Sequence, residues 1–494
     1  MNRARSLFLV SGLAIVLVIA GFFYWKGRPR DWQAMTIADV DRIHELILEN
    51  HPGSVDPSNA AFRQQLETVY KRASQLALET NNSAGHFYTM RAMTVPFRDL
   101  HLGIGFFEAP DRQRSWPGFV VDIKGDGDLV VTRRDIESAP PAGARLVECE
   151  GRSVEELLAD RILPYIGNWA LPAKRPGDAF YLLMDSGNPF VAPLTRCTFE
   201  LGGSRSDYVL EWQPADSALF DELAEAREPT VEQTTGLRVL DNGVVWISIA
   251  TFGVSNPDDA AAFESLMTQI RDSRAQIADA PALVIDVRGN GGGSSISGRE
   301  IASAVWGEPF IDDQAPRIDA IDWRASEFNL SQLERFLPMI EKANGDSSEI
   351  YRKMQAIRSG MQEALANGEI FFHETMSYPP VGDAAPLPVP AAVFFLTDQV
   401  CVSACLDFAD LMMAIPGVTH IGQESSGDTH YLEVMAVSLP SGVAQLSYPT
   451  AAHRGRQRGD NESYIPELHW PGSMADTEGL ESWIAELILS PEGS

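Results

Sequence analysis

The spacing of apolar residues predicts helices near the start of the chain and a mixture of strands and helices in its second half. A first stripe, with a spacing of three or four residues, consists of Ile37, Val40, Ile43 and Ile47. A second stripe with helical spacing runs from Phe62 to Leu76. Thr36 and Asp39 form a capping-box pattern, which predicts that the first helix starts near Thr36. Residues 36 to about 96 are therefore expected to be helical.

From about residue 238 onward, short apolar runs alternate with segments of helical spacing. The predicted strands are residues 244–249, 282–287, 392–396 and 418–422. The predicted helices are residues 257–275, 295–306 and 403–414. This alternation is typical of an α/β fold, in which functional loops follow the ends of strands. Residues 326–368 interrupt it with a helical insertion, which either packs against the core or forms a lid.

The intervening residues, from about 115 to 235, are predicted to form short strands. Two strand-like runs, Phe119–Val121 and Leu129–Val131, flank a Gly-Asp-Gly turn. The stretch Pro141–Val154 resembles part of a PDZ module, and a hairpin followed by a helix is the alternative interpretation.

Length and charge limit the kind of protein. A chain of 494 residues is long enough for about three domains. The formal net charge of −29 argues against nucleic acid and against anionic membrane surfaces as partners. No spacing of cysteine and histidine resembles a zinc site, and no metal or organic cofactor is implied.

Residues 1–30 have the pattern of a targeting segment. Arg3 and Arg5 precede an uncharged stretch from Leu7 to Trp25, and further cations follow it. The stretch approaches the about 20 residues that cross a bilayer, which favours a signal anchor in the membrane over a cleaved signal peptide. We expect the body of the protein outside the cytoplasm, in the periplasm if the protein is bacterial, or secreted if the segment is cleaved. A cytoplasmic body is the alternative.

The four cysteines leave two interpretations open. In an oxidising compartment Cys149 could pair with Cys197, and Cys401 with Cys405. The alternative is that all four are small buried hydrophobic residues.

Three segments carry residues suited to acyl-transfer chemistry. Ser403 follows a predicted strand and opens a predicted helix, where the Ala404 amide can donate to an oxyanion, although a helix-capping serine is the alternative. The glycines that follow the strand at 282–287 let backbone amides approach a substrate, or simply form a flexible turn. His101 offers a general base, although a single histidine is more often structural.

Together these segments resemble one family. The motifs are Asp286–Gly293 (Asp-Val-Arg-Gly-Asn-Gly-Gly-Gly), Ser403-Ala404 and Asp99-Leu100-His101. They occur in the same order in the tail-specific, C-terminal-processing serine proteases and their tricorn-like relatives. The resemblance implies a crotonase/ClpP-like α/β protease core (residues 238–494), a PDZ-like β-rich module (99–237) and an N-terminal helical domain (31–98).

The resemblance also implies a catalytic set. One branch of the family uses a Ser/Lys dyad, but Asp428 stands where that lysine would be, so this branch is excluded. In the tricorn-like branch Ser403 is the nucleophile, His101 the base and Glu462 the residue that orients the histidine. The amides of Ala404, Gly291 and Gly292 then form the oxyanion hole.

Several residues compete for these roles or depart from the family pattern. Asp99, Asp407 and Asp428 compete with Glu462, and His430 is a fallback base. The departures are Leu100, Leu102, Cys405 and Leu406, which either narrow the pocket or mark a degraded site.

The sequence therefore predicts a serine endopeptidase that cleaves polypeptides. One alternative is a catalytically inactive relative that binds peptides as a membrane-anchored adaptor or sensor. Another is a hydrolase of small esters or an acyl-CoA enzyme, which would have a closed apolar pocket instead of an open groove.

Overall fold

The computed structural model describes residues 30–124, 127–225, 231, 233–254, 256–378 and 380–489. The predicted targeting segment, except for Arg30, lies outside these residues. Within the described residues, no helix is both long enough and apolar enough to cross a membrane.

Helices form the N-terminal part of the fold, as the sequence predicted. They are α2 (Trp32–Asn50), α3 (Phe62–Glu79) and α4 (Ser83–Thr94). The predicted start of the first helix at Thr36 is wrong. The helix starts at Trp32 because the Asp31 carboxylate accepts a hydrogen bond from the Ala34 amide at 3.0 Å and caps it there.

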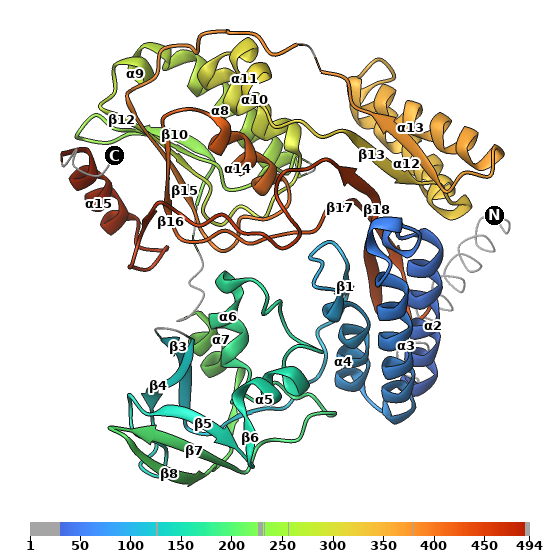
Figure 1. Cartoon of the computed structure of the whole chain (residues 1–494), viewed down its shortest axis with the longest axis vertical. Coiled ribbons are helices and arrows are strands. Elements are labelled where there is room, and N and C mark those ends of the chain that lie inside the picture. Colours follow the sequence, from blue (N-terminus) through green and yellow to red (C-terminus); the bar gives the residue numbers. More distant parts are fainter. Residues whose placement is uncertain are drawn as a thin grey trace, which may run out of the picture.

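These helices pack on an antiparallel sheet in which β1, near the N-terminal helices, pairs with a strand from the last fifth of the chain (Figure 1). Its strands follow the order β1-β18-β13-β14, and β17 also pairs with β18. Their bounds are β1 (Gly103–Phe106), β13 (Ala320–Arg324), β14 (Phe371–Thr375), β17 (Tyr431–Ser438) and β18 (Ala444–Arg454). Between β13 and β14 lie α12 (Glu327–Asn344) and α13 (Glu349–Ala366), which occupy the predicted helical insertion.

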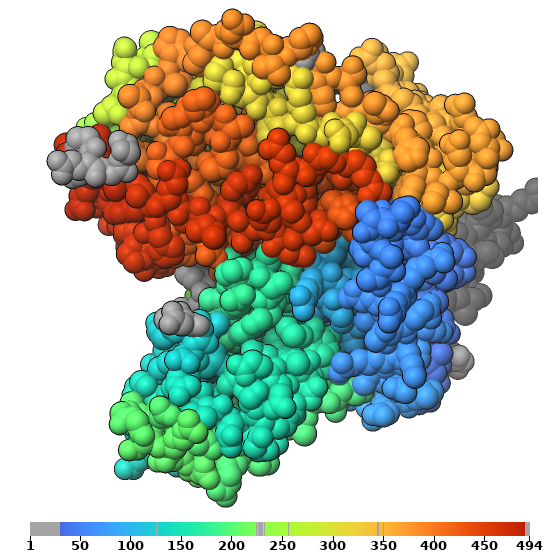
Figure 2. All heavy atoms as spheres, in the orientation of Figure 1, coloured from blue at the N-terminus to red at the C-terminus, as the bar shows by residue number. Residues whose placement is uncertain are grey.

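The β-rich module contains a second antiparallel sheet of order β3-β4-β5-β7-β8, with β6 paired to β5. Its strands are β3 (Phe119–Lys124), β4 (Asp128–Arg134), β5 (Arg145–Cys149), β6 (Arg152–Ser153), β7 (Arg196–Leu201) and β8 (Ser204–Val209). A short ribbon pairs β2 (Arg114–Trp116) with β9 (Gln213–Ala215). The helices of this module are α5 (Val154–Arg161), α6 (Arg175–Phe180) and α7 (Ser217–Glu225). Figure 2 shows the module beside the N-terminal helices on one side of the remaining chain.

The α/β core is built on a sheet of order β10-β11-β12-β15-β16-β19, in which every pair except β10–β11 is parallel. The strands are β10 (Gly236–Val239), β11 (Val245–Ser248), β12 (Ala282–Asp286), β15 (Ala392–Thr397), β16 (Val418–Gly422) and β19 (Leu468–His469). The four strands predicted in this part of the sequence coincide with β11, β12, β15 and β16.

Helices cover both faces of this sheet, which explains why its central strands are apolar throughout. On one face lie α8 (Pro257–Asp272), α9 (Arg274–Asp279), α10 (Ser295–Trp306), α11 (Glu308–Gln314) and α14 (Ala404–Ala414). The other face is covered by α15 (Thr477–Leu489). The loops that leave the carboxyl ends of β12 and β15 are therefore neighbours at one edge of the sheet.

Both cysteine pairs are disulfides. Cys149 and Cys197 face each other across β5 and β7 in the β-rich module. Cys401 and Cys405 are joined across the start of α14. The alternative of four free, buried cysteines is therefore wrong.

Candidate active site

Ser403 occupies the residue immediately before α14, in a backbone conformation that is unusual for serine. Its φ is 59° and its ψ is −126°. A non-glycine residue in such a conformation costs about 1–3 kcal/mol and is found most often at functional sites. Its side chain makes no capping hydrogen bond to the helix. The alternative of a helix-capping serine is therefore wrong, and the hydroxyl is not committed to the helix.

The glycine-rich turn after β12 packs directly against this serine. A Cβ atom added to Gly292 would lie 2.8 Å from the Val402 carbonyl oxygen, 2.9 Å from the Ser403 Cβ and 3.1 Å from the Ala404 nitrogen. Gly292 also has a φ of 100°, which disfavours any side chain. Position 292 thus requires glycine so that the two loops can approach this closely.

Asp398 fixes the two loops to each other. One oxygen of its carboxylate accepts a hydrogen bond from the Gly289 amide at 2.9 Å, and the other accepts one from the Val400 amide at 3.0 Å. Burial raises the pKa of Asp398. The spacing between the glycine turn and the serine loop is therefore set by hydrogen bonds to one buried side chain.

The amides near Ser403 differ in their availability. The Gly292 amide donates to the Asn290 side-chain oxygen at 2.9 Å, so it is not free to bind an oxyanion. No described residue accepts a hydrogen bond from the Ala404 or the Gly291 amide. The Ala404 and Gly291 amides are therefore free to donate to an oxyanion. The third amide named from the sequence, that of Gly292, is occupied, and Gly292 instead allows the close contact with Ser403.

His101 lies in a tight turn just before β1. The Leu102 amide donates to the Asp99 carbonyl at 3.1 Å, and the His101 amide donates to the Asp99 carboxylate at 2.8 Å. The same carboxylate oxygen lies 3.7 Å from His101 Nδ1. Both side chains are buried. Asp99 is the nearest acidic neighbour of the imidazole ring among the described residues.

A second histidine lies on the other side of Asp99. His51 Nε2 is 3.9 Å from the second oxygen of the carboxylate. Within the described part of the chain, none of the three facing atoms, His51 Nε2, Asp99 Oδ2 and His101 Nδ1, has a hydrogen-bond partner. Burial lowers the pKa of His51 to about 3, so this ring is neutral, and burial raises the pKa of Asp99 to about 6. Such buried, unpaired polar groups are costly, which is typical of functional sites.

One loop links the histidine turn to the serine loop. The Ser426 amide donates to the Cys401 carbonyl at 3.0 Å, and Thr429 lies beside Asp99. Residues 426–429 therefore contact both the loop that carries Ser403 and the turn that carries His101. No hydrogen bond joins the Ser403 hydroxyl to His101 or Glu462 among the described residues.

Part of this site lies in a segment that matches a known protein family. Residues 243–464 match the model of peptidase family S41. The matched segment, just under half of the chain, is here called the S41 domain. The match confirms the resemblance to the tail-specific serine proteases, and the peptidases of this family are serine hydrolases. Ser403 and the glycine turn lie within the S41 domain, whereas His101 precedes it.

Solved structures support the same fold. Mature CPAF aligns over 94% of this chain and 99% of its own, with 14% identity and a TM-score of 0.55. Mature CPAF complexed with lactacystin aligns over 92% and 99%, with 14% identity and a TM-score of 0.54. At this identity the likeness establishes the fold alone. The tricorn protease has a TM-score of 0.39, which supports no structural argument. No curated protein sequence matches the chain.

The other carboxylates named as candidates in the S41 domain have different partners. The Glu462 carboxylate is exposed and accepts a hydrogen bond from the Gly459 amide at 2.6 Å. Asp407 accepts one from the Ser295 hydroxyl at 2.6 Å. Asp428, which stands where the Ser/Lys branch has its lysine, is buried and forms ion pairs with Arg456 and Arg458.

Three of the four departures from the family pattern have structural roles in this fold. Leu102 packs in the core between the N-terminal helices and β18, and Leu406 packs in the core of the S41 domain. Cys405 belongs to a disulfide, and the Leu100 side chain is exposed. These four residues therefore give no sign of a degraded site.

His430, the fallback base, is held between two acids. Its Nδ1 lies 2.9 Å from an Asp460 carboxylate oxygen, and its Nε2 lies 3.4 Å from an Asp56 oxygen. Burial by itself would lower the pKa of His430, but the hydrogen bonds to these two acids outweigh burial and raise it to about 9. The ring is therefore a cation near neutral pH and cannot accept a proton there.

This arrangement predicts a pH-dependent stability. Because the folded pKa of His430 exceeds the ordinary value of 6.5, its contribution is complete below pH 6.5 and disappears as the pH rises through about 9. We expect the free energy of unfolding to fall by at most about 3 kcal/mol over this range. Chemical denaturation at several pH values measures this fall, and His430→Gln should flatten it. An unchanged slope in the variant would contradict the assignment.

Sequence reasoning missed Glu433, which lies on β17. Its φ is 62°, and its carboxylate lies 3.8 Å from His453 Nε2. His101 lies within electrostatic range of it. A single glutamate in an amphipathic strand carries no distinguishing signal, so only its positive φ reveals it.

A cleft of about 660 Å³ lies between α14 and the helical insertion, and neither Ser403 nor His101 is among the described residues that line it. It is bordered by Ser295, Asp407 and Phe408 near the glycine turn and by Lys353 on α13. Its wall is mixed, with apolar and charged side chains, and it is open to solvent.

The close packing at Gly292 gives a direct test of the loop arrangement. Gly292→Ala is expected to lower the acylation rate of Ser403 by about 10²- to 10³-fold, because the new Cβ must displace Ser403 or the Ala404 amide. Gly291→Ala is the matched control, since its Cβ would meet nothing within 4 Å and the amide is retained, so a much smaller loss is expected. Rates of labelling by a fluorophosphonate measure both. Equal effects of the two substitutions would contradict the packing argument.

Proposed function

We propose that this chain is a serine endopeptidase with Ser403 as nucleophile and His101 as base. The observation that carries the proposal is the strained, uncapped Ser403 at the start of α14, with Gly292 packed against it. A hydroxyl held in this way at a helix N-terminus, beside free backbone amides, is suited to attack on a carbonyl carbon.

The proposed reaction follows from the groups at the site. The Ser403 hydroxyl attacks the peptide carbonyl while His101 accepts its proton, and the Ala404 and Gly291 amides bind the oxyanion. His101 then protonates the leaving amine, and water hydrolyses the acyl-enzyme by the reverse proton path. We assign the orientation of His101 to Asp99, because its carboxylate is the nearest to the ring. Glu462, the assignment by resemblance, would first have to leave the Gly459 amide.

The substrate and the location are proposed on independent grounds. We propose that the open cleft beside α14, with a volume of about 660 Å³, takes an extended polypeptide and that the PDZ-like module shapes the entry to the site. The two disulfides favour an oxidising compartment. We therefore place the body outside the cytoplasm, in the periplasm if the protein is bacterial, with the N-terminal segment as a membrane anchor.

Active-site labelling tests the proposal. The folded body, residues 31–494, is treated with a fluorophosphonate, and the modified peptide is identified by mass spectrometry. Lactacystin, which is bound in a structure of CPAF, serves as a second probe. A single adduct on Ser403, with cleavage of an unfolded polypeptide at internal bonds, supports a serine endopeptidase. An unlabelled but folded protein would favour the peptide-binding alternative instead.

A further inference from the structure

We propose that the Cys401–Cys405 disulfide is a positioning element for Ser403, so that the reactivity of the serine depends on an intact bridge. This inference rests on the function proposed above. It concerns two residues that do not touch the reacting atoms.

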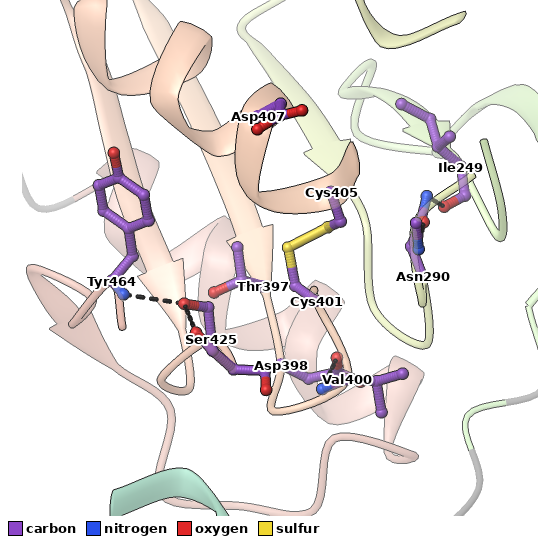
Figure 3. Close-up of a disulfide and its surroundings, with 12 residues drawn as sticks. Ile249, Asn290, Thr397, Asp398, Val400, Cys401, Cys405, Asp407, Ser425 and Tyr464 are labelled. Carbon is purple, nitrogen blue, oxygen red and sulfur yellow. Dashed lines mark hydrogen bonds between the residues drawn. A yellow bond between two sulfur atoms is a disulfide. The ribbon is translucent and has the colours of Figure 1, made fainter. Parts of the chain in front are cut away.

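The bridge encloses the serine within a short segment. Ser403 lies midway between the two cysteines, which are four positions apart. Both cysteine side chains are fully buried. Figure 3 shows the bridge at the point where the loop after β15 enters α14, with Thr397 beside it and Asp407 further along the helix.

The bridge links the loop that precedes Ser403 to the helix that follows it. On the loop side, the Cys401 carbonyl accepts a hydrogen bond from the Ser426 amide at 3.0 Å, and the Cys401 amide donates to the Asp398 carbonyl at 3.2 Å. On the helix side, Cys405 belongs to the first turn of α14, and its amide donates to the Val402 carbonyl at 3.2 Å. A covalent link between loop and helix restricts the backbone conformations of the residues between them.

Those residues include one with a strained backbone. Ser403 has a positive φ, and such conformations persist only where the surroundings determine them. If the bridge is opened, Ser403 can relax, and both its hydroxyl and the Ala404 amide move away from the Gly292 turn. A displacement of about 1 Å at a catalytic group costs about 100-fold in rate.

A general role in stability explains this bridge poorly. A disulfide stabilises a fold mainly by closing a loop in the unfolded chain, and its effect grows with the length of that loop. Cys149 and Cys197 are 48 positions apart, whereas Cys401 and Cys405 are separated by only four. The Cys401–Cys405 bridge therefore constrains the unfolded chain less than the Cys149–Cys197 bridge does, although it is the one that flanks the proposed nucleophile.

The chemistry of opening the bridge is a two-electron reduction. A dithiol gives two electrons and two protons to the sulfur–sulfur bond, which yields two cysteine thiols and the cyclic disulfide of the reagent. Reoxidation by a small-molecule disulfide, which takes up the two electrons and two protons as two thiols, restores the bond and the serine geometry with it.

Two double variants test the inference. Cys401→Ala with Cys405→Ala is expected to fold and to react with a fluorophosphonate about 10- to 100-fold more slowly than the parent. Cys149→Ala with Cys197→Ala is the control, and it should label at the parental rate even if its melting temperature falls. Circular dichroism and thermal unfolding verify the fold of each. Parental labelling by the first variant would overturn the inference.

A second measurement covers the case in which the first variant does not fold. The parent is reduced by a dithiol under native conditions, free thiols are assigned by mass spectrometry, and labelling is followed. Labelling should fall as the thiols at 401 and 405 appear and recover on reoxidation. Full labelling of protein that is reduced at both positions overturns the inference but leaves the peptidase proposal intact. A folded, oxidised parent that does not label removes both proposals.

Discussion

His101→Ala is expected to slow the acylation of Ser403 by about 10⁴- to 10⁶-fold, because the hydroxyl then has no proton acceptor. The fold should be retained. The ring nitrogen Nδ1 has no hydrogen-bond partner, and the bond that the His101 amide donates to Asp99 does not involve the side chain. Second-order rate constants for fluorophosphonate labelling at pH 7.5, together with cleavage of an unfolded polypeptide, measure the effect.

His430→Gln provides the matched control for this experiment. Its ring is a cation near neutral pH and is held by Asp460 and Asp56, so it has no role as a base. The variant should label close to the parental rate and lose stability instead. If labelling stops in His430→Gln and continues in His101→Ala, the base has been assigned to the wrong histidine.

The sequence predicted the elements whose patterns are long and uniform. The apolar runs at 282–287 and 392–396 coincide with β12 and β15, since both strands are covered by helices on each face. The helix that follows Ser403 was predicted because its apolar residues recur at helical spacing. The start of the first helix was misplaced, because the capping Asp31 lies in a polar stretch with no periodicity to mark it.

The roles of the site residues were less predictable from the sequence, because they depend on which hydrogen bonds form in the fold. The Asn-Gly-Gly sequence contained a signal that Asn290 would occupy the Gly292 amide, since asparagine side chains often bond to the backbone two residues later. No sequence pattern could show that Glu462 accepts from Gly459 while Asp99 lies beside His101. That difference depends on how two distant turns approach each other in space.

Asp99→Asn separates activity from stability, and it is expected to change them in opposite directions. Asparagine can still accept the hydrogen bond from the His101 amide, but it cannot stabilise the imidazolium that forms during acylation. The labelling rate should fall by about 10³- to 10⁴-fold. Glu462→Gln is the matched control and should lower the rate far less, because its carboxylate is bonded to Gly459.

The stability of Asp99→Asn has a distinctive pH dependence. Burial raises the pKa of Asp99 from 3.8 to about 6, so the folded parent is penalised for carrying the charge above that pH. The parent binds more protons when folded, and its free energy of unfolding therefore falls between pH 3.8 and 6 and is level above. The neutral asparagine avoids this loss. The variant should gain at most about 3 kcal/mol over the parent at pH 7.5 and nothing near pH 3.5. If Asp99→Asn labels at the parental rate, the orienting role returns to Glu462. If the variant labels more slowly and is more stable, the buried charge of Asp99 lowers the stability of the fold and supports His101 in catalysis.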